Sequence, residues 1–288
     1  MPELPSNIAG LGEIVRDCTL CPRNCHVDRA GPKRGACRIG LTARIDSVGP
    51  HFGEEPVLVG RGGSGTIFLS ACNLDCVFCQ NSDISHSAAG QELTPKELAD
   101  AAVRLERAGC ENVNFVTPTH VSHAIAEAVW SARAMGLTVP VVYNCGGYES
   151  VETLRLLEGL VEIYMPDFKY AAAEAGRKYS GVPDYPTVAD AALAEMFRQV
   201  GRLQLDRRDV AVRGVLVRHL VMPGNLAGSR EVIARVARIA PGCAINVMGQ
   251  YHPAHRAAEF DELMSRPSAA QVRQLRDFAT SLGLVRVD

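Results

Sequence analysis

The chain lacks several features that would place it in a common functional class. Lys and Arg number 30 and Asp and Glu 32, a net charge of −2, so no basic field indicates nucleic-acid binding. No segment approaches the ~20 uninterrupted apolar residues that span a bilayer. The first fifteen residues lack the charged-then-apolar layout of a signal peptide. We therefore expect a globular protein of the cytoplasm that binds neither nucleic acid nor membrane.

Cysteine, by contrast, is abundant. In a reducing compartment the ten cysteines are expected to serve metal, cluster or redox chemistry rather than disulfides. Four lie within residues 18–37, three lie within 72–79, and Cys110, Cys145 and Cys243 stand alone. The first two groups are candidates for metal centres. Cys110 and Cys243 directly precede apolar segments, and we interpret them as ordinary buried residues.

Short apolar segments alternate with amphipathic ones through most of the chain. The pattern predicts strands at residues 66–71, 112–117, 139–144, 161–168, 212–221 and 244–249, and helices at 94–109, 121–135, 149–159, 187–200, 229–239 and 268–282. Such alternation implies a parallel sheet with right-handed crossovers. We expect a partial (β/α)6 TIM-like barrel, although periodicity alone does not separate it from a doubly wound open sheet.

The amino-terminal part of the chain does not follow this alternation. Residues 1–60 are expected to form a cysteine-rich metal-binding extension followed by a small hairpin, and residues 61–288 the barrel. Within the barrel, the carboxyl ends of parallel strands are where chemistry gathers. Those ends carry Ala71-Cys72, Thr117 to His120, Asn144 to Gly147, Pro166 to Lys169, Arg218 to Gly224, and Gln250 to His252.

The sharpest motif is a C-x3-C-x2-C loop directly after the first predicted strand, formed by Cys72, Cys76 and Cys79. Closely spaced thiolates on one loop can converge on one iron–sulfur cluster. Three ligands for four irons leave one iron open to a substrate or cofactor. The alternative is a zinc loop that borrows a fourth ligand from elsewhere.

This motif resembles the signature of the radical S-adenosylmethionine (SAM) superfamily. The segments SGTIFLSACNLDCVFCQN, NVNFVTPTH, YMPDFKY, RKYSGV and VRHLVMPG further resemble the activating enzymes of glycyl radical enzymes, in particular the PflX-like relatives of the pyruvate formate-lyase activating enzyme. The likeness covers most of residues 60–255. The segment CTLCPRNCHVDRAGPKRGACRIG is similar to the amino-terminal extension of the PflX-like group.

The resemblance implies an oxidoreductase that binds SAM at a [4Fe–4S] cluster and cleaves it reductively to a 5′-deoxyadenosyl radical, which abstracts hydrogen from a substrate. It also implies a one-electron donor such as flavodoxin or ferredoxin. The substrate is either a glycine in a glycyl radical protein or a small molecule such as a sugar, nucleoside or amino-acid-like metabolite. A non-catalytic iron–sulfur or zinc protein is a third hypothesis, but a carrier needs no polar residues around a barrel rim.

Matching the motifs also implies SAM contacts. Phe78, between two cluster cysteines, would lie against the adenine. Asp167 and Lys169 match an Asp-x-Lys pair, in which Lys169 could bind the SAM carboxylate, and His252 matches a histidine near the nucleoside. In place of the Gly-Gly-Glu-Pro-like segment that receives the SAM amino group, this chain has Thr117 and Thr119, whose hydroxyl and backbone oxygens would take over that contact.

The third strand ends in Asn144 and Cys145, followed by two glycines that would let the backbone approach a ligand closely. We assign Asn144 to the cofactor site. Cys145 is a candidate catalytic thiol that could donate a hydrogen atom to a product radical, although such a thiol can equally be packed in the core.

The amino-terminal cysteines, Cys18, Cys21, Cys25 and Cys37, can close a zinc site or a second, fully ligated [4Fe–4S] cluster. A module this short usually needs such a staple, and free thiols are the remaining alternative. The basic residues between these cysteines are either solvated loop charges or a docking surface for an acidic partner or electron donor.

Overall fold

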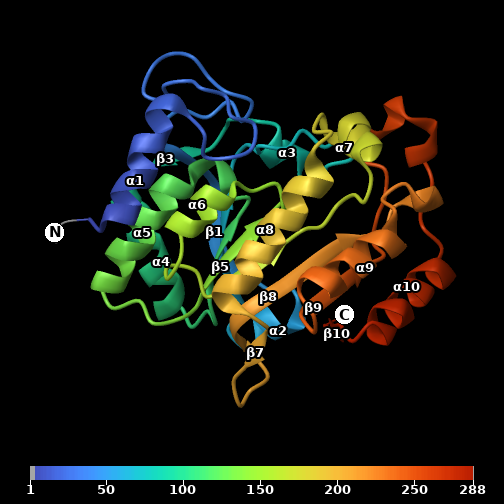
Figure 1. Ribbon diagram of the computed structural model, residues 1–288. Helices are drawn as coiled ribbons and strands as arrows, with labels where there is room; N and C mark the ends of the chain where they lie inside the picture. The colour runs from blue at the N-terminus through green and yellow to red at the C-terminus, as the bar shows by residue number, and fades with distance from the viewer. Residues whose placement is uncertain (1–3, 288) are drawn as a thin grey trace.

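The computed structural model describes residues 4–287. All six predicted strands are present, as β2 (Ser64–Leu69), β4 (Val113–Val116), β5 (Val141–Cys145), β6 (Ile163–Pro166), β8 (Ala211–Leu220) and β9 (Ala244–Met248). They pair in parallel in that order. The sheet curves but does not close, so the partial barrel is confirmed (Figure 1).

The six predicted helices are also present. They are α4 (Pro95–Arg107), α5 (Ser122–Ala134), α6 (Val151–Leu156), α8 (Tyr185–Val200), α9 (Ser229–Ile239) and α10 (Ala269–Ser281). Helix α4 shows how local sequence sets a boundary. Thr94 and Glu97 form a capping box ahead of the helix, with Pro95 at its first position.

Several elements were not predicted. In the sheet these are β1 (Ala43–His51), β3 (Gln91–Leu93), β7 (Gln204–Leu205) and β10 (Val285–Arg286). The further helices are α1 (Ser6–Ile14), α2 (Pro56–Val59), α3 (Ser82–Ser85), α7 (Ala173–Ser180), and the 3-10 turns η1 (Val15–Asp17), η2 (Thr119–Val121), η3 (Pro223–Asn225), η4 (Ala257–Glu259) and η5 (Asp261–Leu263). Strand β1 pairs antiparallel with β2 and with β3. Both partners of β1 therefore lie beyond residue 60, and β1 belongs to the barrel sheet.

The two faces of the sheet carry different residues because side chains alternate along each strand. On the inner face, Val142, Ile163 and Leu216 pack with Leu58 of α2 in one small core, which fills the end of the barrel where the parallel strands begin. Toward the carboxyl ends, the same face turns polar with Asn144, Asp167 and Arg218. The alternate residues pack outward against the helices in the larger cores.

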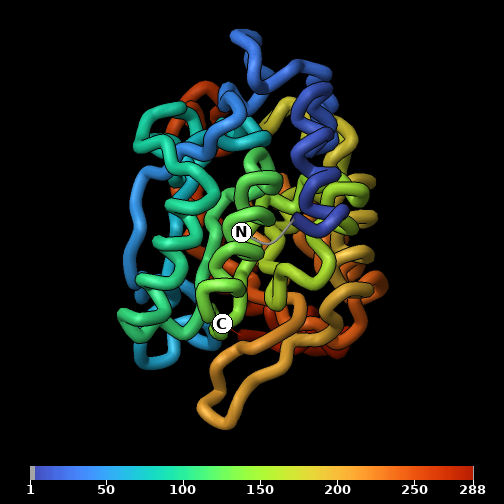
Figure 2. The backbone as a smooth tube through the Cα atoms, turned by 90° about the vertical axis from the view of Figure 1, so that its left-hand side faces the viewer, coloured from blue at the N-terminus to red at the C-terminus, as the bar shows by residue number. Residues whose placement is uncertain are grey.

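We call residues 18–40, which follow α1 in the sequence, the amino-terminal module. The module lies at one end of the molecule, and the turn between β7 and β8 projects at the opposite end (Figure 2). Hydrogen bonds fix both the module and α1 to the barrel helices. Thr153 Oγ1 donates to the Leu20 carbonyl of the module at 2.9 Å, and Asn7 Nδ2 of α1 donates to the Leu156 carbonyl at 2.9 Å. Within residues 4–287, no helix is both long and apolar enough to cross a membrane.

Candidate functional site

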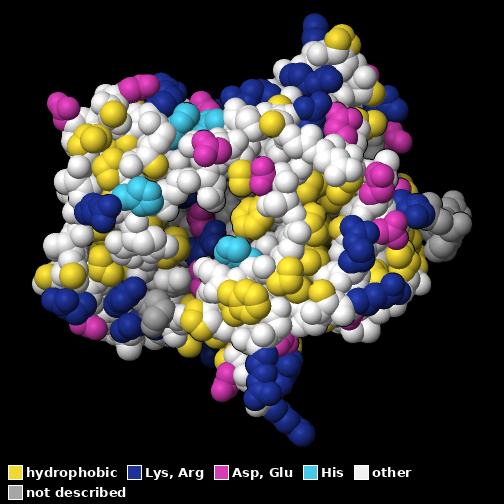
Figure 3. Space-filling model, turned by 180° about the vertical axis from the view of Figure 1, so that it is seen from behind, with side chains coloured by type: hydrophobic (Ala, Val, Ile, Leu, Met, Phe, Trp, Pro, Cys, Tyr) yellow, Lys and Arg dark blue, Asp and Glu magenta, His cyan; other side chains and the backbone are white. Residues whose placement is uncertain are grey.

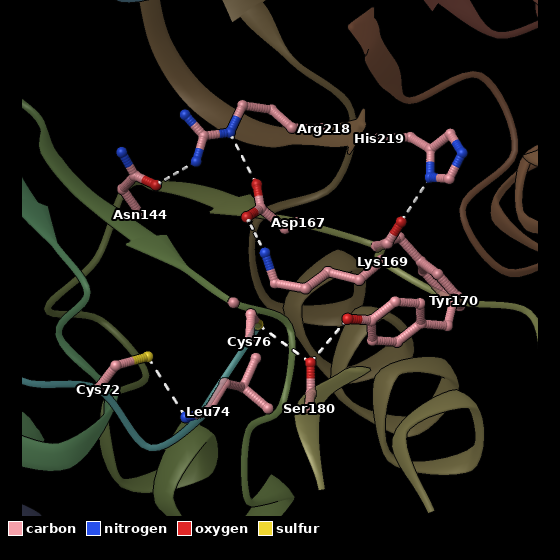
Figure 4. A network of polar contacts seen from close by, with 12 residues as sticks. Cys72, Leu74, Cys76, Asn144, Asp167, Lys169, Tyr170, Ser180, Arg218 and His219 are labelled. Atoms are coloured by element: carbon pink, nitrogen blue, oxygen red, sulfur yellow. Dashed lines mark hydrogen bonds and ion pairs between the residues drawn. The ribbon is translucent and has the colours of Figure 1, made fainter. Parts of the chain in front are cut away.

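Three strand ends bring charged and polar side chains together on the inner face of the barrel (Figure 4). Lys169 Nζ donates to Asp167 at 2.7 Å, and Arg218 Nε donates to the other oxygen of the same carboxylate at 3.0 Å. Arg218 also donates to Asn144 Oδ1 at 2.7 Å. Because Asp167 and Arg218 are neighbours across β6 and β8, the sheet register itself sets this network.

The network places two cations around one carboxylate in a poorly hydrated site. Burial alone would raise the pKa of Asp167, but Lys169 and Arg218 outweigh it and hold that pKa below its ordinary value. Burial would lower the pKa of Lys169, whereas Asp167 and the nearby Cys76 sulfur raise it. Lys169 therefore carries a fixed positive charge that can face an anionic group.

The cluster loop lies beside this network. Burial raises the pKa of the Cys76 thiol, and the nearby Lys169 ammonium group offsets only part of this effect. Ser180 Oγ donates to Cys76 Sγ at 3.0 Å, and the Leu74 amide donates to Cys72 Sγ at 3.3 Å. Burial raises the pKa of both thiols. In the absence of metal they are held protonated, and a bound metal would displace the protons.

A cavity of about 260 Å³ lies between the cluster loop and the charged network. We call it the central cavity. Its lining residues are Phe78, Cys79, Gln80, Asn81, Asp167, Lys169, Arg218, Leu220, Met222, Met248 and Gln250. The face opposite to that of Figure 1 is hollowed at its centre, with both Lys/Arg and Asp/Glu side chains inside the hollow (Figure 3).

The residues around this cavity fit a SAM-binding iron–sulfur cluster. Three thiols share one loop, two of them accept hydrogen bonds, and a buried cation stands beside the cavity. In a cubane each cysteine binds its own iron, so the sulfurs need not converge on a single ion. Among residues 4–287, no three His, Cys, Asp or Glu side chains are arranged to hold one metal ion.

Two further predicted SAM contacts, Phe78 of the cluster loop and His252, also lie at or beside the cavity. Phe78 lines it and packs edge-on against Tyr170 and Tyr251, with ring centroids 6.3 and 6.0 Å apart. His252 is exposed just beside the cavity, where the Gln80 amide donates to its Nδ1 at 3.2 Å.

Two other predicted residues, Thr119 and Cys145, point away from the cavity. Thr119 is buried and its hydroxyl donates to Glu149 at 2.7 Å. Cys145 is 3 % exposed and lies on the outer side of β5, where it also contacts Glu149. Our expectation that Cys145 faces the opening is therefore not met, because Asn144 takes the inward position. Thr117 lies at the rim in the left-handed region (φ 61°), a strained conformation for a β-branched residue.

The glycines after Cys145 serve packing. A Cβ on Gly147, which has a φ of 76°, would lie 2.1 Å from the Asp167 carbonyl oxygen. A Cβ on Gly146 would lie 2.8 Å from a methyl group of Leu74 in the cluster loop. The close backbone approach predicted here thus brings neighbouring loops of the rim together.

All four amino-terminal cysteines border one small cavity, of about 10 Å³, which Arg29 and His120 also line. His120 is 1 % exposed. Its Nε2 bonds to the Ser70 carbonyl at 2.9 Å, while its Nδ1 lacks a partner within the described chain. Arg29 is buried and donates to the carbonyls of His120 and Gly40. The module thus reaches the strand end that precedes Cys72.

Two functional candidates, Ser180 and Glu149, were missed from sequence, whereas Arg218 and His120 were recognised only as strand-end residues without an assigned role. Arg218 lies on the inner face of β8, and the alternation of side chains along that strand could have indicated its place in the site. Ser180 stands in the quoted RKYSGV segment, but its bond to Cys76 depends on the fold of α7. Glu149 gave no signal in the sequence. For His120, the sequence does not indicate the burial that leaves its Nδ1 without a partner within the described chain.

Comparison with known proteins agrees with this site. The model of the radical SAM superfamily matches residues 66–194. A protein of Methanocaldococcus jannaschii, itself uncharacterized, is 31% identical over 279 residues, which cover 94% of this chain and 76% of that protein.

Solved structures are similar to parts of this chain at low sequence identity. Streptococcus suis SuiB, solved with its precursor peptide SuiA, is 11% identical with a TM-score of 0.50 over 75% of this chain and 46% of SuiB. HydG, a maturase of the [FeFe]-hydrogenase, is 13% identical with a TM-score of 0.46 over 77% of this chain and 54% of HydG. The chain thus spans about half the length of each. From its cysteine loop, its partial barrel and the superfamily model that matches residues 66–194, the chain belongs to the radical SAM superfamily.

Proposed function

We propose that the protein is a radical SAM oxidoreductase in which Cys72, Cys76 and Cys79 hold a [4Fe–4S] cluster and the central cavity binds SAM. One observation carries this proposal: the three-cysteine loop and the Asp167–Lys169–Arg218 network face the same cavity. The bound cluster and SAM would supply the reductive cleavage that yields the 5′-deoxyadenosyl radical.

The protein's own residues would bind and orient SAM. Lys169 offers its ammonium group to the SAM carboxylate. Asp167 accepts a hydrogen bond from that ammonium group and holds it in place, and Arg218 in turn orients Asp167. Phe78 offers an apolar ring to the adenine, and Thr117, at the rim, offers polar atoms to the amino group. The apolar side chains of Leu220, Met222 and Met248 exclude water from the cavity wall.

For the substrate, we propose a glycine in a partner polypeptide, as in the activating enzymes that the sequence resembles. The open side of the partial barrel supports this, because the hollow reaches the surface (Figure 3) and leaves room for a peptide loop. The test is to mix the reduced enzyme and SAM with a glycyl radical protein. A glycine-centred EPR doublet supports the proposal, and its absence together with conversion of a small metabolite contradicts it.

We also propose a second metal centre at Cys18, Cys21, Cys25 and Cys37, either zinc or [4Fe–4S]. Its support is that all four cysteines border one cavity, together with the unpartnered Nδ1 of His120. With its Nε2 proton donated to a carbonyl, the neutral imidazole keeps a free lone pair on Nδ1. Both kinds of centre need cysteines kept as reduced thiols, which fits the reducing cytoplasm, where we place the protein.

Cysteine substitution tests the main proposal. Anaerobically reconstituted protein with dithionite and SAM should release methionine and 5′-deoxyadenosine. Replacing Cys72, Cys76 or Cys79 by Ala should abolish release, because the cluster loses one of only three anchors. Cys243→Ala is the matched control, since Cys243 is buried just before β9. Near-normal release by any one of the three loop variants would overturn the assignment.

A further inference from the structure

A second, larger cavity borders the cluster loop away from the central cavity. Its volume is about 370 Å³, and its wall includes residues 73–75 and Val77, which alternate in sequence with the three cysteines. None of these residues lines the central cavity, which the loop reaches through Phe78 and Cys79. The loop thus separates the two cavities. We call the second one the basic cavity.

The name follows from its charges. The basic cavity is lined by Arg23, Arg38, Arg177, Lys178 and Arg256, against one carboxylate, Asp75. At its rim, Arg177 pairs with Glu174, Lys178 with Glu262, and Arg256 with Glu259. The Arg177–Glu174 and Arg256–Glu259 pairs are solvent-exposed and contribute little to stability, so carboxylates of a partner can replace Glu174 and Glu259. Asp75 is itself paired, with His86 at 2.9 Å.

Positive charge continues from the cavity onto the amino-terminal module. Residues 18–40 contain five Lys or Arg and one Asp. Lys and Arg side chains gather on the projection at the top of Figure 3, which is this module. The cavity therefore opens beside a cationic surface large enough to face a protein rather than a small anion, and opposite charge on a partner would steer its approach.

The wall between the basic cavity and the cluster sulfurs is thin. Arg23 Nε donates to the Asn73 carbonyl at 2.9 Å, and its Nη2 donates to the Ser180 carbonyl at 3.2 Å. Ser180 in turn donates through Oγ to Cys76 Sγ at 3.0 Å. A redox group bound over Arg23 would be separated from the cluster only by the cysteine loop. Bound SAM would occupy the central cavity on the opposite side of that loop.

We propose that the basic cavity is the docking site of an acidic one-electron donor, a flavodoxin-type flavoprotein. This inference rests on the proposed function and adds the partner's surface. In the transfer, the reduced flavin gives up one electron and the cluster core changes from 2+ to 1+. No proton or leaving group moves. The cations of the cavity hold the acidic rim of the donor, and the loop backbone carries the electron.

Charge reversal with matched controls tests the docking. The probe is oxidised recombinant bacterial flavodoxin, titrated into the reconstituted protein while its FMN fluorescence is followed. Arg38→Glu with Arg177→Glu should weaken binding at least tenfold, and binding by the unchanged protein should fall steeply with salt. The control is Arg104→Glu with Arg207→Glu. It makes the same charge change at exposed positions on α4 and on the β7–β8 turn, and we expect less than a twofold effect.

Assays of SAM cleavage with two different reductants distinguish failure of the docking site from failure of the proposed function. With dithionite the cavity variant should cleave SAM like the unchanged protein, whereas with reduced flavodoxin its rate should fall at least tenfold. Equal flavodoxin-supported rates, or no flavodoxin binding by the unchanged protein, would overturn the docking site. No cleavage with dithionite by the unchanged protein would overturn the proposed function, and the titration would still decide the docking. If the double variant loses iron, Arg256→Glu alone replaces it in the same two assays.

Discussion

The hydroxyl of Ser180, at the end of α7, donates a hydrogen bond to the sulfur of Cys76 at 3.0 Å. The Tyr170 hydroxyl lies 2.7 Å from the same Ser180 oxygen, so two residues far from the cysteine loop in sequence orient one donor at it. Hydrogen bonds to cluster sulfurs stabilise the more negative, reduced state and thereby raise the reduction potential.

Ser180→Ala should therefore lower the reduction potential of the cluster by tens of millivolts without loss of iron. The measurement is a redox titration followed by EPR. Tyr170→Phe serves as the graded control, since it removes the phenol but leaves the serine in place, and its change should be smaller. An unchanged potential in Ser180→Ala would show that this hydrogen bond does not act on the cluster.

Asp167→Asn should destabilise the protein, because it leaves Lys169 and Arg218 without their shared carboxylate in a largely buried site. Removing one partner of a buried ion pair costs about 3 kcal/mol or more. Urea denaturation of the cluster-free protein measures this cost.

Lys169→Met removes the cation instead and should weaken SAM binding at least tenfold while the cluster spectrum is retained. Equilibrium dialysis with labelled SAM gives the affinity. If Lys169→Met lowered stability but left SAM affinity intact, the pair would be structural only.

The sequence predicted the barrel better than the site. Alternating apolar segments located six strands and six helices because burial of the sheet requires that pattern. Strand β1 was missed because only its first residues are buried. Helix α7, AEAGRKYS, was missed because its glycine and charges are typical of a loop. Cys145 was assigned to the opening because it ends a strand, yet the parity of β5 turns Asn144 inward instead. Which of two neighbouring residues faces inward depends on the register of the strand, and the spacing of residues in the sequence does not specify that register.

Glu149 should make the stability of the protein depend on pH. Burial raises its pKa from the ordinary 4.5 to about 7, and hydrogen bonds from Thr119, Tyr143 and Cys145 offset only part of this effect. The folded state therefore binds a proton more tightly than the unfolded state. The contribution of Glu149 to the free energy of unfolding is fully present below pH 4.5. It is lost as pH rises toward 7, and the total loss is about 3 kcal/mol.

Glu149→Gln should flatten that part of the profile. Urea midpoints of the cluster-free protein at pH 5, 6 and 7 provide the comparison, and the difference between variant and unchanged protein isolates Glu149 from other groups. Parallel profiles for the two proteins would mean that Glu149 is ionised in the fold across this range.

The amino-terminal cysteines lead to the last prediction, which concerns metal content. Replacing Cys18 and Cys21 together by Ala should remove either one zinc or about four irons, while the SAM-dependent signal of the other cluster survives. Four thiolates fill a tetrahedral zinc site or supply every iron of a cubane, so the lost metal identifies the centre. The module has little apolar core apart from these residues, so its segment 18–40 should also become sensitive to proteolysis. The matched control is Cys110→Ala with Cys243→Ala, which removes two buried thiols outside both groups. If the Cys18/Cys21 variant keeps the full metal content, these cysteines are free thiols, and the fold of the module depends on Arg29 and its carbonyl partners instead.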